Sequence, residues 1–229
     1  MNSGGAPRLY IVTDRAATGG RPLPAVVRAA LAGAVRGGLG GEALAVQLRE
    51  KDLPARALRE LGAELRAITR AFGAALYVND RVDVALAVEA DGVHLTGTSL
   101  SPADVRAVAP GLGVAISTHA PSELRAFDGA RDEGPRIDFA VFGPIRDTPS
   151  KRGYGPPVGL EALRAAAGSR VPVLAIGGLS ARDVPALVAA GARGLACIRA
   201  VMSAADPEKD AYLLAQALAA APVTQPHQT

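Results

Sequence analysis

The sequence is poor in residues that form disulfides, bind zinc or stack on nucleic-acid bases. It contains one cysteine, Cys197, three histidines and no tryptophan, and aromatic residues make up only 3% of the chain. A single cysteine excludes an intrachain disulfide and, with three histidines, is too few for a Cys/His zinc site. This cysteine usage predicts a cytoplasmic protein. The shortage of aromatic side chains argues against the stacking surfaces of single-strand nucleic-acid binders.

Long apolar runs and a large net charge are also missing. No run approaches the ~20 apolar residues of a membrane span, and residues 1–7 lack the charged-then-apolar layout of a secretory signal. Lysine and arginine total 25 against 22 aspartate and glutamate, a formal charge of +3. We therefore expect no membrane and no nucleic-acid partner, and small anionic substrates suit this charge better.

What the sequence does contain is an alternation of short apolar runs with longer Ala/Leu/Arg segments of helical period. The runs that predict strands are 9–13, 43–48, 75–78, 92–95, 113–117, 137–142, 171–176 and 194–198. The segments that predict helices are 24–36, 54–72, 81–89, 102–109, 121–131, 160–167, 181–190 and 207–220. The strands are almost continuously apolar, as in a parallel sheet covered by helices.

Eight strand–helix units predict a single (β/α)₈ TIM barrel over residues 8–221. We interpret residues 1–7 as a disordered leader and residues 222–229 as a disordered tail. A doubly wound open sheet is the main competing fold. Eight units, with no Gly-x-Gly-x-x-Gly after the first strand, favour the closed barrel.

Polar residues follow the second and third predicted strands, where the chemistry of such barrels takes place. Gln47, Arg49 and Lys51 alternate, so they share one side of the strand and its extension. Two neighbouring cations repel each other unless an anion binds between them, and phosphate oxygens can bind both arginine and lysine. The alternative is that they pair with Glu50 and Asp52.

The third strand is followed by Asn79 and Asp80. Asp80 is a candidate Mg²⁺ ligand, since magnesium prefers carboxylates combined with substrate phosphate oxygens. Either residue could instead be a helix N-cap.

Candidate residues also follow the fifth to eighth strands. Ser117 and His119 end the fifth, and His119 is either an acid/base group or a structural donor. The loop with Thr148, Ser150 and Lys151 is either a flap over a phosphate or a surface turn. After the last two strands, Gly177-Gly178 and Arg199 form a candidate phosphate site. We expect His94 and Cys197 to be buried in strands, whereas His227 lies in the tail.

In combination, these stretches resemble the thiamin phosphate synthase/TenI family. They occur in the family's order and cover almost the whole chain: LYIVTD (9–14), VQLREKD (46–52), VNDRVDV (78–84), DGVHL (91–95), STH (117–119), FGPI (142–145), Thr148–Lys151 and AIGG (175–178).

The resemblance implies a barrel, usually a homodimer, that acts on phosphorylated heterocycles in thiamin biosynthesis. The family's synthases join hydroxymethylpyrimidine diphosphate to a thiazole phosphate and release pyrophosphate. By motif, Gln47, Arg49, Lys51 and Asn79 would hold the diphosphate, Asp80 would bind Mg²⁺, and Lys151 would stabilise the leaving pyrophosphate. Ser117 would lie near the pyrimidine. The thiazole phosphate would meet Thr148, Ser150 and Gly177-Gly178.

Two positions depart from the synthase pattern. Ser99 stands where a synthase usually has the second Mg²⁺-binding aspartate, which predicts a weakened metal site. Arg199 replaces a small residue, commonly serine. Both changes are compatible with the family's TenI branch, whose thiazole tautomerases need no metal and use a histidine at the position of His119. A non-catalytic paralogue that binds thiamin intermediates and regulates is a further alternative.

Overall fold

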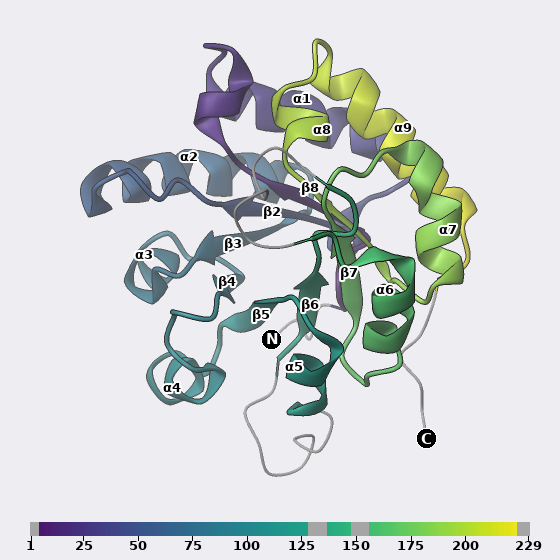
Figure 1. Ribbon diagram of the computed structural model, residues 1–229. Helices are drawn as coiled ribbons and strands as arrows, with labels where there is room; N and C mark the ends of the chain where they lie inside the picture. Colours follow the sequence, from purple (N-terminus) through teal and green to yellow (C-terminus); the bar gives the residue numbers. More distant parts are fainter. Residues whose placement is uncertain (1–4, 128–136, 148–155, 224–229) are drawn as a thin grey trace.

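A computed structural model describes residues 5–127, 137–147 and 156–223. Eight parallel strands close into a barrel in the order β1 to β8 (Figure 1). This confirms the predicted (β/α)₈ fold and excludes the open sheet. The strands are β1 (Leu9–Val12), β2 (Leu44–Leu48), β3 (Ala75–Asn79), β4 (Gly92–Leu95), β5 (Gly113–Thr118), β6 (Phe139–Phe142), β7 (Val173–Ile176) and β8 (Gly194–Cys197).

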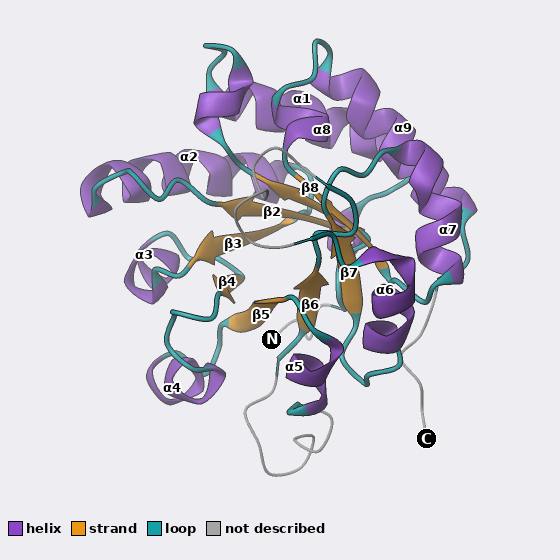
Figure 2. Ribbon diagram, viewed as in Figure 1, coloured by secondary structure: helices purple, strands orange, loops and turns teal. Residues whose placement is uncertain are grey.

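The helices lie around the outside of the barrel (Figure 2). They are α1 (Leu23–Arg36), α2 (Ala55–Ala71), α3 (Val82–Ala87), α4 (Pro102–Val108), α5 (Pro121–Arg125), α6 (Gly159–Ala167), α7 (Val184–Ala189), α8 (Arg199–Met202) and α9 (Pro207–Ala220). Short 3-10 turns at Arg15–Thr18 and Gly41–Ala43, and the four-residue α8, were not predicted, whereas the 3-10 turn Ala181–Asp183 forms the start of the predicted helix 181–190. One turn of helix is too short to show a hydrophobic period, which explains why the sequence pattern missed them.

Alternate residues of the strands divide the core into two parts. The outer cluster lies between strands and helices, and the inner cluster fills the barrel. Three inner rings, Tyr10, Tyr77 and Phe139, meet edge to face with centroids 5.2–5.8 Å apart. This is the favoured geometry for aromatic quadrupoles. The interior is therefore filled with side chains, and any ligand must bind at its mouth.

The amino end of the barrel is closed by the segment before β1. Ala6 is buried in the inner cluster, and its carbonyl accepts a hydrogen bond from Arg193 Nε at 3.2 Å. The end of the predicted leader, residues 6 and 7, is therefore buried against the barrel and is not disordered, whereas residues 1–4 lie outside the described residues. At the other terminus, Arg8 donates to the carbonyls of Ala221 and Pro222, and residues 224–229 are outside the description.

Among the described residues, no helix combines the length and the apolar character needed to cross a bilayer. The nine described helices instead pack on the barrel or on one another, as α1 and α9 do along their length.

Candidate active site

Polar side chains from neighbouring strands meet at the carboxyl end of the barrel. Gln47 is the fourth residue of β2 and Asn79 the last of β3, and Gln47 Nε2 donates to Asn79 Oδ1 at 3.1 Å. Gln47 is only 3% exposed, and Asn79 is half-buried. The hydrogen bond fixes both amides, which leaves the Asn79 NH₂ group as a donor for a ligand. Two of the predicted diphosphate-binding residues are thus brought together.

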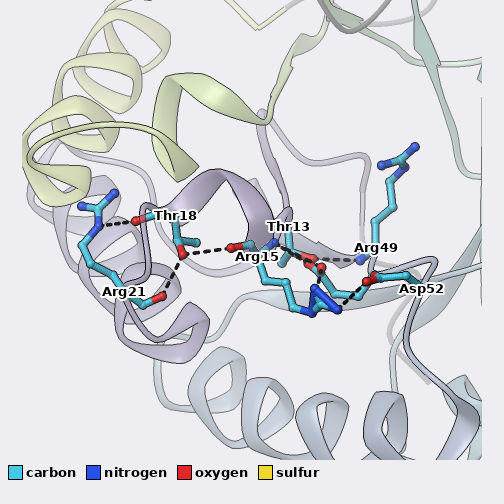
Figure 3. A network of polar contacts seen from close by, with 7 residues as sticks. Thr13, Arg15, Thr18, Arg21, Arg49 and Asp52 are labelled. Atoms are coloured by element: carbon cyan, nitrogen blue, oxygen red, sulfur yellow. Dashed lines mark hydrogen bonds and ion pairs between the residues drawn. The ribbon is translucent and has the colours of Figure 1, made fainter.

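A polar network joins the loop after β1 to the end of β2 (Figure 3). Glu50 is buried, and both of its carboxylate oxygens accept from the Arg15 backbone N–H at 3.1 Å. The Arg15 guanidinium pairs with Asp52. Thr13 is fully buried; its hydroxyl donates to Glu50 and its Oγ1 accepts from the Arg49 backbone N–H at 2.9 Å. Burial raises the pKa of Glu50, while the Thr13 and Arg15 contacts oppose the rise.

This network shows which residue pairs with the acidic neighbours of Arg49 and Lys51, the two cations at the rim of the barrel mouth. The acidic neighbours Glu50 and Asp52 pair with Arg15, so the predicted alternative, in which they pair with Arg49 and Lys51, is wrong. In the described part of the chain, no carboxylate forms an ion pair with Arg49 or Lys51. The Arg49 side chain points away from the network (Figure 3). Within the described ranges, Arg49 and Lys51 therefore carry positive charge without a paired carboxylate, two and four residues beyond Gln47 in the chain.

A second polar chain crosses the inside of the barrel. Tyr10 Oη lies 3.2 Å from His94 Nδ1, and His94 Nε2 lies 2.8 Å from Ser117 Oγ. Burial, and to a lesser extent the Arg49 cation, lowers the pKa of His94 to about 3, so this imidazole is neutral near pH 7. The prediction that His94 is buried is confirmed. The sequence pattern missed its contact with Ser117, a candidate substrate-binding residue, although period two places both side chains inside the barrel.

The ends of β5, β6 and β7 form a compact junction. His119 is exposed, its Nδ1 lies 2.5 Å from the Gly143 carbonyl, and its backbone N–H donates to Glu123. Gly177 has φ +113°, and a Cβ there would lie 2.7 Å from Pro144 Cα. Only glycine fits this close approach with such a backbone. The predicted Gly177-Gly178 turn therefore exists, and both of its residues have positive φ.

Asp80 is the only predicted metal ligand, and its surroundings fit a metal ion that has most of its ligands from elsewhere. It is exposed, with φ +65°, and the N-cap of α3 is Arg81, which makes no side-chain cap bond. The N-cap interpretation of Asp80 is therefore wrong. The Ser99 hydroxyl is engaged in a turn, where Oγ accepts from Thr96 N–H at 2.7 Å. No three metal-binding side chains cluster anywhere in the described ranges. Asp80 thus fits an ion that arrives with phosphate oxygens, because Mg²⁺ accepts one carboxylate plus substrate and water.

The remaining predicted residues are only partly described. Arg199 is the exposed first residue of α8, two residues beyond β8, where a cation can reach a ligand at the barrel mouth. Cys197 is buried as predicted, and burial raises the pKa of its thiol to about 12. Thr148, Ser150 and Lys151 lie outside the described residues, as does His227.

Comparisons with known proteins show which family this chain is similar to. The model of the thiamine monophosphate synthase family, TMP-TENI, matches residues 9–201. A thiamine-phosphate synthase of Roseiflexus castenholzii is 46% identical over 205 residues, covering 87% of this chain and 83% of the relative. One from Moorella thermoacetica is 43% identical over 202 residues, covering 86% and 89%. The solved thiamine phosphate pyrophosphorylase of Pyrococcus furiosus superposes with a TM-score of 0.80 at 33% identity, covering 95% and 98%. The chain belongs to the thiamine monophosphate synthase (TMP-TENI) family.

Proposed function

We propose that this chain is a thiamine-phosphate synthase, a transferase that joins hydroxymethylpyrimidine diphosphate to a thiazole phosphate and releases pyrophosphate. The observation that carries the proposal is that, among the described residues, no carboxylate pairs with Arg49 or Lys51, which follow directly after the strand that carries the Gln47–Asn79 hydrogen bond. A tautomerase that handles a single monophosphate has no evident use for this pair. The synthase names of the relatives favour the same activity over tautomerase or regulatory roles.

The chemistry follows from the leaving group. When the bond between the pyrimidine methylene carbon and the diphosphate oxygen breaks, that carbon becomes a cation and negative charge grows on pyrophosphate. Fixed cations that meet this developing charge lower the barrier without rearranging during the reaction. Arg49 and Lys51 would do this from the segment that follows β2, together with Lys151. Gln47 and Asn79 would orient the diphosphate, and the thiazole nitrogen then attacks the carbon.

Magnesium is part of the proposal as an ion held by Asp80 together with the diphosphate. When bound, it supplies additional neutralisation of the leaving group. Its affinity without the substrate is expected to be low, because the protein contributes a single carboxylate and Ser99 contributes no charge.

The thiazole phosphate would bind on the opposite side of the mouth. The backbone N–H groups of the Gly177-Gly178 turn would donate to it, and Thr148 and Ser150 would add hydroxyl groups. Asp183, which accepts from the Ser180 backbone N–H at 2.8 Å and pairs with Arg146, holds this turn in place. Arg199 would contribute a cation to the same phosphate. His119 would be available as a proton-transfer group beside it. A cytoplasmic homodimer, as implied by the family resemblance, belongs to the same proposal.

One experiment separates the candidate activities. The protein is supplied with both thiamin precursors, with and without Mg²⁺, and separately with the unaromatised thiazole carboxylate phosphate. A synthase is expected to form thiamin phosphate and pyrophosphate in equal amounts, and only when both precursors are present. Formation of the aromatic thiazole alone would show a tautomerase, and binding without any turnover would show a regulatory paralogue.

The Ser99→Asp variant tests the metal site. A second carboxylate should strengthen Mg²⁺ binding, so we expect the Mg²⁺ concentration for half-maximal activity to fall about tenfold, the effect of roughly 1.4 kcal/mol. The measurement is a Mg²⁺ titration of the initial rate at saturating substrates. Gln216→Glu, which adds a carboxylate at an exposed position of α9, is the control for added charge. An unchanged Mg²⁺ requirement in Ser99→Asp would argue against a metal at Asp80.

A further inference from the structure

The side chains of Tyr10, His94 and Ser117 form a hydrogen-bonded relay that runs from the buried interior of the barrel to its mouth. Tyr10 is fully buried and His94 is 2% exposed, whereas Ser117, near the end of β5, is half-buried. Ser117 is therefore the only member of the three with access to a ligand. The direction of its hydrogen bond to His94 decides what it offers to that ligand.

Two arrangements of protons are compatible with the two distances. In the first, Tyr10 Oη–H donates to His94 Nδ1 at 3.2 Å and His94 Nε2–H donates to Ser117 Oγ at 2.8 Å. In the second, His94 Nδ1–H donates to Tyr10 and Ser117 donates to Nε2. The second arrangement leaves the Tyr10 proton without an acceptor, because His94 is the only hydrogen-bond partner of that hydroxyl among the described residues. An unsatisfied buried donor is costly, so the first arrangement is favoured.

The charge states of both rings agree with this choice. The lowered pKa of His94 keeps the imidazole neutral, so that it carries one N–H and one acceptor nitrogen. Burial raises the pKa of the Tyr10 hydroxyl, which therefore keeps its proton. The two rings are also nearly parallel, with an interplanar angle of 19° and centroids 5.7 Å apart, which holds the imidazole in this orientation.

We propose that Tyr10 is a positioning residue that acts through His94 to fix Ser117 as a hydrogen-bond donor toward the mouth of the barrel. Because Ser117 Oγ accepts from His94, its own proton is directed to the ligand, where a ring nitrogen of the pyrimidine would accept it. This inference rests on the proposed function for the identity of the ligand. The direction of the hydrogen bonds rests on the protein alone.

The tautomer of His94 is the first test. In ¹⁵N NMR spectra of the ligand-free wild-type protein at pH 7, His94 Nε2 is expected to resonate as a protonated nitrogen and Nδ1 as an unprotonated one. The signals are assigned with the variants His119→Gln and His227→Gln. In Tyr10→Phe the Nδ1 acceptor loses its donor, and we expect a mixture of the two tautomers. A wild-type His94 that carries its proton on Nδ1 would overturn the inference.

Steady-state kinetics are the second test. Tyr10→Phe is expected to raise the KM for hydroxymethylpyrimidine diphosphate about fivefold, the effect of one weakened hydrogen bond, while kcat and the KM for the thiazole phosphate change less than about twofold. Tyr77→Phe is the matched control. Tyr77 shares the inner cluster, but its hydroxyl lies at the amino end of β5, 3.0 Å from the position of a Cβ on Gly113. Equal effects of the two variants would contradict the inference, because they would show a packing effect alone.

A double variant separates the relay from general packing. If Tyr10 acts through Ser117, then Tyr10→Phe should change the KM for the pyrimidine substrate by less than about twofold in a Ser117→Ala background. Additive effects would refute the coupling. Failure of the wild-type protein to form thiamin phosphate would instead overturn the proposed function, and the His94 tautomer would still decide the direction of the hydrogen bonds.

Discussion

Replacing Arg49 or Lys51 by alanine is expected to lower kcat/KM for thiamin phosphate formation by about 10²–10³-fold, the usual effect of removing one preorganised group that stabilises developing charge. The physical reason is that both cations lie at the rim without a carboxylate partner among the described residues. Their charge is therefore available to a diphosphate. The structure requires neither for folding: Lys51 is exposed, and Arg49 is held by its backbone N–H, which alanine retains.

The measurement combines initial rates with urea unfolding. The free energy of unfolding should change by less than about 0.5 kcal/mol, because neither side chain is buried in the core. Lys209→Ala is the matched control, since Lys209 is an exposed lysine at the start of α9. We expect it to retain full activity. Full activity of Arg49→Ala or Lys51→Ala would remove the diphosphate site from the β2 rim, whereas loss of folding would show that the side chains serve the fold.

The fold could be predicted because its signals are local and repeated. Each strand is a short apolar run, each helix has its own period, and eight repeats allow few arrangements other than a closed barrel. The meeting of Gln47 and Asn79 was predictable for the same reason. Both lie at the carboxyl ends of adjacent parallel strands, and such ends share one rim.

The pairing of charges within the rim was not predictable. Glu50 and Asp52 are neighbours of Arg49 and Lys51 in sequence, yet their partner is Arg15, from the loop after β1. That choice depends on the short 3-10 turn at Arg15–Thr18, which has no sequence signature strong enough to place it. Likewise, the contact of His94 with Ser117 depends on the register of β4 and β5, which pairs His94 with Ala115. The alternation of a strand predicts which face a residue lies on, but it does not predict the register that sets the position of that residue along the barrel axis.

Gly177→Ala is expected to lower the stability of the protein strongly. Two costs act together at this position. The backbone has φ +113°, which side-chain-bearing residues rarely adopt, and the new Cβ would lie 2.7 Å from both Cα and Cβ of Pro144. Backbone strain and overpacking together are expected to lower the free energy of unfolding by about 2–5 kcal/mol. The measurement is equilibrium urea unfolding, with the slope compared between variants to verify the same two-state transition.

Gly19→Ala separates the two costs. Gly19 also has positive φ, at +66°, but no atom lies within 4 Å of the Cβ position, so its replacement should cost only about 1–2 kcal/mol. Because the Gly177 turn is the proposed site of the thiazole phosphate, the folded fraction of Gly177→Ala should also show a raised KM for that substrate. The KM for the pyrimidine diphosphate should stay within about twofold, since it depends on the opposite side of the rim. Equal losses of stability in the two variants would show that the contact with Pro144 relaxes at little cost. Equal increases in both KM values would show that the turn does not form a separate phosphate site.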